Sequence, residues 1–128
     1  MPFEIFRKPE SKDIPTPYPP FPQARAVDPF ATQKPNEKPI VVTYMHMSKS
    51  TTPMPFTPLY ECDETGVVLE GALNIEDEEG NVATLKAGDS FFVKRGSKIL
   101  FGSETAALVV KVAGRYDGEG WAQYVPSE

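Results

Sequence analysis

The stretch that decides the fold is DETGVVLEGALNIEDEEGNVATLKAGDSFFVKRGSKILF, residues 63–101. Short runs rich in Val, Ile, Leu and Phe alternate in it with glycines and with the acidic loop DEEGN at 77–81. β-Branched and aromatic residues favour strands, whereas Gly, Asn and Asp favour the tight turns between them. The pattern predicts strands over 66–76, 82–89, 90–94 and 98–102 and no helix.

Three further β-rich runs lie on either side of this stretch, PIVVTYMHMS at 39–48, TPLYECD at 57–63 and AALVVKVAG at 106–114. The last run is apolar on both faces, which is typical of a strand inside a sheet rather than at its edge. About seven short strands in a chain of 128 residues predict a single all-β domain, either a sandwich or a small barrel.

The first 40 residues differ in composition, because they hold ten of the fourteen prolines. Proline lacks a backbone N–H and fixes φ, so this segment is not expected to run as a helix or a central strand. It nevertheless carries apolar rings at Phe3, Phe6, Tyr18, Phe21 and Phe30. We therefore expect residues 1–38 to be an extended proline-rich arm that packs on the barrel or on a partner subunit, and residues 39–128 to be the barrel. A proline-rich ligand for a recognition domain is the rival interpretation.

The composition also bears on partners and location. A net charge of −5 argues against a nucleic-acid or anionic-membrane partner. The single cysteine, Cys62, excludes an internal disulfide and fits a reducing compartment. The N-terminus lacks the layout of a signal peptide, so a cytoplasmic protein is expected. The arm gives a physical reason to expect a homodimer.

The positions of four residues resemble a known family pattern. Glu64 and Gly71 stand at the Glu-to-Gly spacing of the first cupin motif, with VLEG at 68–71. Gly88 and Gly96 match the second motif, with AGD at 87–89. The chain thus resembles the small single-domain cupins related to ethanolamine-utilisation protein Q. The resemblance implies a cupin barrel, also called a jelly roll.

The metal-binding positions of that pattern depart from it. The first-motif histidines would fall at Pro58 and Tyr60, or at Thr57 and Leu59 with the longer spacing. The second-motif histidine would fall at Ile99, so only Glu64 remains. A catalytic metal site needs about three protein ligands. We therefore expect no metal and no other cofactor. A metal site would require His46, Cys62 and Glu64 to converge.

The remaining polar residues suggest acid–base chemistry. The catalytic candidates are His46, Glu64, Tyr44 and Tyr60, with His46 or Glu64 as acid or base and the tyrosines as hydrogen-bond donors to a developing enolate. The arrangement requires an inward-facing pair of His46 and Tyr44 with Glu64 opposite. Alternatively, His46 is a packed histidine, Glu64 a surface carboxylate in an acidic hairpin, and Tyr60 a filler of the space left by an imidazole.

Substrate binding is assigned to Phe91, Lys111, Met54 and Cys62. Lys111 would stabilise an anion or form a Schiff base if its strand face lines the cavity. If Leu108, Val110 and Val112 form the core instead, Lys111 faces outward. Cys62 and Met54 could equally be packing residues.

Together these residues predict a metal-independent cupin that binds a small organic molecule, aromatic or polyketide-like, in its barrel. The reaction class would be proton transfer, namely an isomerisation, cyclisation, dehydration or lyase step. The alternative is a non-catalytic metabolite-binding or assembly cupin of the ethanolamine-utilisation type. Acetate kinase activity has been proposed for that family, but the sequence contains no Walker-type glycine loop for phosphate.

Overall fold

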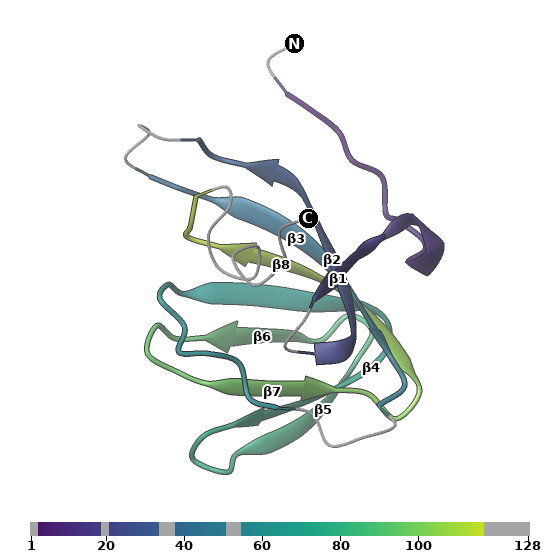
Figure 1. The fold of residues 1–128 in the computed structure, drawn as a ribbon, viewed down its shortest axis with the longest axis vertical. Coiled ribbons are helices and arrows are strands. Elements are labelled where there is room, and N and C mark those ends of the chain that lie inside the picture. Colours follow the sequence, from purple (N-terminus) through teal and green to yellow (C-terminus); the bar gives the residue numbers. More distant parts are fainter. Residues whose placement is uncertain (1–2, 19–20, 34–37, 51–54, 117–128) are drawn as a thin grey trace.

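The computed structural model describes residues 3–18, 21–33, 38–50 and 55–116. This part of the chain contains eight β-strands and one 3-10 turn (Figure 1). The strands are β1 (Thr16–Tyr18), β2 (Phe21–Ala31), β3 (Val41–Ser48), β4 (Glu64–Asp77), β5 (Val82–Lys86), β6 (Ser90–Val93), β7 (Ile99–Gly102) and β8 (Ala106–Ala113). The 3-10 turn η1 spans Ser11–Asp13. Within these ranges, no helix has the length and apolar character needed to cross a membrane. The predicted all-β class is confirmed.

Strand β4 is the longest strand and links the two parts of the sheet. Its first half pairs with β8 and β6, and its second half pairs with β5 and β7, which lie together in the lower part of Figure 1. The pairing shifts between Val68 and Glu70, and Gly71 follows with a φ of 74°. A Cβ at Gly71 would lie 1.9 Å from the carbonyl oxygen of Ala106. Only glycine fits this bend, which accounts for the glycine of the first motif.

Strand β8 lies between β3 and β4, in the interior position predicted for it. Along β3 the buried residues alternate with partly buried ones, so that Met45 and Met47 face the core while Tyr44 and His46 face the other way. We call the core-facing side of the sheet the inner face. Its hydrophobic residues are Ala24, Ala26, Met45, Met47, Val68, Leu73, Val93, Ile99, Phe101, Ala107 and Val109.

Strand β2 corrects the expectation that the proline-rich segment forms no interior strand. It lies between β1 and β3 in the sheet order, and it pairs with β3 over Ala24–Val27 and again at Phe30 and Ala31. The register shifts between these two stretches, where Pro29 stands. The strand tolerates this proline because the irregularity removes the need for its missing N–H. The segment therefore adds two strands to the sheet.

The prediction of a strand over 57–63 is wrong, because no residue of that segment belongs to a strand. The segment instead makes backbone hydrogen bonds to the first residue of β7 and to the turn between β6 and β7. Thr57 N–H donates to the carbonyl of Ile99, and Tyr60 exchanges backbone hydrogen bonds with Ser97 and Gly96. This pairing leads the Tyr60 side chain toward the start of β4.

Candidate active site

Three neighbouring strands present polar side chains on the inner face at one end of the sheet. Lys111 on β8 is in register with Thr43 on β3 and with Gly66 on β4. Glu64, the first residue of β4, lies on the same face as Gly66, because side chains alternate along a strand. The β8 alternation buries Val109 and Lys111 together, so the orientation in which Lys111 faces outward is wrong.

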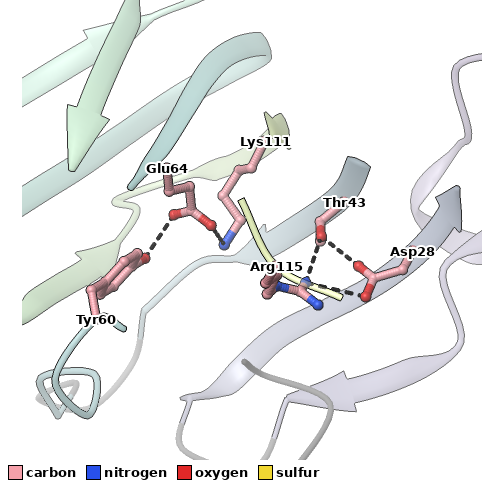
Figure 2. A network of polar contacts seen from close by, with 6 residues as sticks. All are labelled: Asp28, Thr43, Tyr60, Glu64, Lys111 and Arg115. Atoms are coloured by element: carbon pink, nitrogen blue, oxygen red, sulfur yellow. Dashed lines mark hydrogen bonds and ion pairs between the residues drawn. The ribbon is translucent and has the colours of Figure 1, made fainter. Parts of the chain in front are cut away.

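Glu64 joins Lys111 and Tyr60 in a buried network (Figure 2). The Lys111 Nζ lies 3.5 Å from Oε1 of Glu64, and the two side chains are only 6% and 8% exposed. The Tyr60 hydroxyl donates a hydrogen bond of 2.7 Å to Oε2 of the same carboxylate. Each carboxylate oxygen therefore has its own partner, one of them a cation. The alternative that Glu64 is a surface carboxylate is wrong, since its strand position points it inward.

Aromatic rings border this network. The Lys111 ammonium lies 5.3 Å from the centroid of the Phe101 ring, and the Phe91 ring is 5.9 Å from that of Phe101. Gly66 makes room for Phe91, because a Cβ at Gly66 would lie 2.4 Å from the tip of its ring. Phe91 is partly buried and packs against the core. Met54 lies outside the described residues.

A second buried polar group lies beside the first and is drawn on the right of Figure 2. The Arg115 guanidinium donates 3.1 Å hydrogen bonds to Oδ2 of Asp28 and to Oγ1 of Thr43. The Thr43 hydroxyl in turn donates to the other Asp28 oxygen, Oδ1. The sequence reasoning missed this group. The one sequence feature that pointed to it is that Thr43 shares a strand face with two methionines. Asp28 and Arg115 lie far apart in the sequence, so no local pattern joins them to Thr43.

Cys62 lies close to both groups and is partly buried. Burial raises the pKa of its thiol, and the negative charge of Glu64 raises it further. Because the thiolate is the nucleophilic form of cysteine, this environment suits a packed thiol rather than a reactive one. The neighbouring chain positions explain the placement: Gly114 N–H donates to the carbonyl of Asp63, which holds residues 62–64 against the end of β8.

His46 and Tyr44 lie on the opposite face of the sheet from Glu64, so the predicted inward-facing pair is wrong. The physical reason is the alternation of β3, which sends Met45 and Met47 into the core. The Tyr44 ring packs against Phe6 of the N-terminal segment, with centroids 5.4 Å apart. His46 borders a surface groove of about 500 Å³ whose other residues include Lys8 and Glu70.

The electrostatic surroundings of His46 follow from this position. Burial lowers the pKa of its imidazole, and the positive charge of Arg25 lowers it further, while Glu70 acts in the opposite direction. The ring is therefore held in its neutral form at neutral pH. This supports the alternative that His46 is a packed histidine of the outer face.

The residues at the cupin metal position do not fit a divalent ion. Of the described residues, no three His, Cys, Asp or Glu side chains are grouped as ligands. Glu64, the one retained ligand, already holds a lysine cation on one oxygen and a tyrosine hydroxyl on the other. A second cation beside Lys111 would be repelled. His46 and Glu64 lie on opposite faces and do not converge.

The fold and this inner-face site define the class of protein: a small cupin barrel whose ligand position carries an ion pair. A comparison with protein families gives the narrower assignment. The model of the EutQ-like cupin domain matches residues 43–113, more than half of the chain. The chain belongs to this family.

Individual relatives agree with the assignment. A stretch of 51 residues is 43% identical to acetate kinase EutQ of Salmonella typhimurium, covering 40% of this chain and 22% of that protein. A crystal structure of ethanolamine utilization protein Q from the same species superposes with a TM-score of 0.60 at 28% identity, over 73% of this chain and 71% of that one. KdgF from Halomonas superposes with a TM-score of 0.59 at 20% identity, over 75% and 84% of the two chains, which shows a shared fold.

Proposed function

We propose that this protein binds a small organic carbonyl compound on the inner face of its barrel and catalyses proton transfer without a metal. The single observation that carries the proposal is the buried contact between Lys111 and Glu64, a potential acid and a potential base 3.5 Å apart. Buried charges are costly unless paired, and catalytic acids and bases are often arranged in such sites. Aromatic rings beside the pair suit an apolar or aromatic substrate body.

The roles follow from the contacts. Glu64 would accept a proton from the carbon next to the substrate carbonyl, and the Lys111 ammonium would stabilise the negative charge that develops on the carbonyl oxygen. The Tyr60 hydroxyl, bonded to the other carboxylate oxygen, would hold Glu64 in position. Return of the proton to a different atom completes an isomerisation, and loss of a neighbouring leaving group completes a lyase step.

The name of the Salmonella relative, acetate kinase, does not transfer with the match. The matched stretch covers 22% of that protein, so the chain spans about a fifth of its length. A kinase needs groups that hold nucleotide phosphates, and the sequence offers no Walker-type loop for them. The inner-face residues favour proton transfer over phosphoryl transfer.

Deuterium exchange tests the proposal without a known substrate. The protein is incubated in D2O with a panel of small ketones, keto acids and aromatic ketones, and replacement of C–H by C–D is followed by NMR. We expect at least one compound to exchange with the wild-type protein and to lose about 100-fold or more in rate with Glu64→Gln. The exposed Glu70→Gln on the same strand is the matched control and should keep the rate.

The rival function, a non-catalytic binding or assembly cupin, predicts a different pattern. Compounds would then bind, as seen by protein chemical shifts, without any exchange that depends on Glu64. Exchange that is equally fast in the wild-type and Glu64→Gln proteins would contradict the proposed role of the carboxylate.

A further inference from the structure

We propose that Lys111 Nζ is a nucleophile that forms an iminium with a small aldehyde or ketone, so that the site acts by covalent rather than only electrostatic activation. The inference rests on the proposed function and narrows its substrate class to compounds with a free carbonyl. It also gives Glu64 a second role, that of moving the proton that makes the amine reactive.

The first supporting observation is that Lys111 differs from every other lysine that the structure describes. Its side chain is 6% exposed, whereas the other described lysines are all exposed. An exposed lysine at neutral pH is a free amine only about one part in a thousand. At 6% exposure the Lys111 side chain makes little contact with solvent. Its amine instead contacts a carboxylate and an aromatic ring, the kind of surrounding in which nucleophilic lysines occur.

The second observation is the proton acceptor. Transfer of one proton from Nζ to Oε1 of Glu64, across a contact of 3.5 Å, turns two buried charges into a neutral amine and a neutral acid. That oxygen is placed to take the proton that the amine must lose before it attacks a carbonyl. The Phe101 ring, 5.3 Å from Nζ, forms an apolar wall on one side of the pair.

The covalent step balances with these groups alone. The ammonium gives a proton to the Glu64 carboxylate, and the free Nζ attacks the carbonyl carbon, which yields a carbinolamine after a proton moves from nitrogen to oxygen. Neutral Glu64 then protonates the carbinolamine hydroxyl, which leaves as water. The product is an iminium beside a carboxylate anion, so the charge pair present at the start is restored. No oxidant, reductant or other reactant is required.

The iminium would assist the proposed proton transfer. A positively charged C=N withdraws electrons from the adjacent carbon more strongly than a neutral carbonyl does, so the C–H beside it becomes more acidic. Glu64, again a carboxylate and 3.5 Å from the nitrogen in the free protein, lies within reach of that carbon. Tyr60 donates to the far oxygen of Glu64 and thereby acts as a positioning residue.

Reductive trapping tests the inference directly. The full chain is incubated at neutral pH with a limiting amount of acetaldehyde or acetone and sodium cyanoborohydride, which reduces the iminium to a stable amine. Peptide mapping by mass spectrometry then locates the adduct. We expect Lys111 to be alkylated at least about tenfold faster than the average exposed lysine, whose amine is almost fully protonated. In denaturant this preference should disappear.

Two variants sharpen the result. Lys111→Arg should lose the fast adduct, whereas Lys86→Arg, on exposed strand β5, should keep it. Glu64→Gln should slow labelling of Lys111 itself about tenfold or more, because the carbinolamine loses the acid that protonates its hydroxyl. The wild-type map decides the question even if Lys111→Arg proves unstable.

The outcomes separate this inference from the proposed function. Adducts spread evenly over the exposed lysines, with Lys111 unlabelled, would overturn the inference. If deuterium exchange still depended on Glu64 in that case, the proposed function would stand with Lys111 as an electrostatic group. If Lys111 labelling and Glu64-dependent deuterium exchange were both absent, both the inference and the proposed function would be wrong.

Discussion

The described part of the molecule contains two buried ion pairs a short distance apart, and their chemistry differs. Arg115 and Asp28 are 8% and 9% exposed with an N–O distance of 3.1 Å, and Thr43 bonds to both partners. Lys111 and Glu64 are buried to the same degree, but their contact is 3.5 Å and the hydroxyl of the third member, Tyr60, donates to the carboxylate. A guanidinium does not lose its proton in proteins, whereas an ammonium can. We therefore expect the Arg115 pair to stabilise the fold and the Lys111 pair to take part in the proposed proton transfer.

The positions of the two pairs support this difference. Asp28 lies on β2, Thr43 on β3 and Arg115 just beyond β8, so their contacts tie the N-terminal segment to the end of the last strand. The Lys111 pair joins the adjacent strands β4 and β8, which are already connected by a continuous backbone ladder. The first pair therefore adds a connection that the backbone lacks, and the second does not.

The largest expected effect comes from breaking the first pair. Arg115→Met leaves the Asp28 carboxylate buried without its cation, and such a change costs about 3–5 kcal/mol. We expect this loss in the free energy of unfolding, measured by urea denaturation. The exposed pair of Lys8 and Glu70 is the control, since Lys8→Met should cost less than about 1 kcal/mol. Equal effects of the two variants would contradict a structural role for the Arg115 pair.

A smaller loss is expected from Tyr60→Phe. The variant removes the hydroxyl that donates 2.7 Å to Glu64, and a hydrogen bond to a charged group is worth about 1–2 kcal/mol when one partner is partly exposed. Deuterium exchange should fall more steeply than stability, because Glu64 loses its orientation. A drop in stability with an unchanged exchange rate would show that Tyr60 only fills space.

Removing the whole second pair should change stability least among the charge variants. Lys111→Met combined with Glu64→Leu replaces two buried charges with apolar side chains, and such replacements are close to neutral, within about 1 kcal/mol. The double variant should fold normally and lack both exchange and Lys111 labelling. If it unfolded as readily as Arg115→Met, the second pair would also be a structural connection and the contrast between the pairs would fail.

The smallest effect concerns pH and a residue outside both pairs. Burial, and secondly the positive charge of Arg25, lowers the pKa of His46 in the folded protein below its ordinary value of 6.5. Below pH 6.5 the unfolded state binds the proton more readily, so the His46 contribution to stability is complete above that pH and is lost as pH falls through the lowered folded value.

His46→Gln should therefore flatten the decline in the free energy of unfolding between about pH 7.5 and about pH 5.5, where carboxylates titrate little. Urea midpoints across that range measure it. Deuterium exchange should be unaffected, since His46 lies on the opposite face from Glu64. A lower exchange rate in this variant would show that His46 contributes to the proposed proton transfer.

The sequence predicted the strands that are rich in apolar residues and bounded by turns, and it failed where tertiary contacts decide. The runs at 66–76 and 106–114 are rich in Val, Leu and Ile and are bordered by turn residues, so β4 and β8 were predicted closely. The segment at 57–63 has strand-like residues, yet its bonds are made to a turn, and Pro58 interrupts any ladder. The sheet position of β2 was missed because proline content outweighed a bulge that only a partner strand reveals.

For the site, Tyr60 was predicted on the side of Glu64, and its hydroxyl donates to that carboxylate although residues 57–63 form no strand. The orientation of His46 was wrong because one strand in isolation does not show which face meets the core. Asp28 and Arg115 are 87 residues apart, and no local pattern joins them. The homodimer and the cytoplasmic location stay predictions.

The pairing of β2 with β3 bears on how the protein can be shortened. The family match begins at residue 43, inside β3, and ends at residue 113, before Arg115. A chain trimmed to that match would leave the open side of β3 with free N–H and C=O groups, which invite other chains to add and aggregate. In the intact protein, β2 covers that side, and β1 forms the new border with Pro17 in it, where a missing donor discourages further addition. The proline-rich segment thus covers a strand edge that the family match alone would leave open.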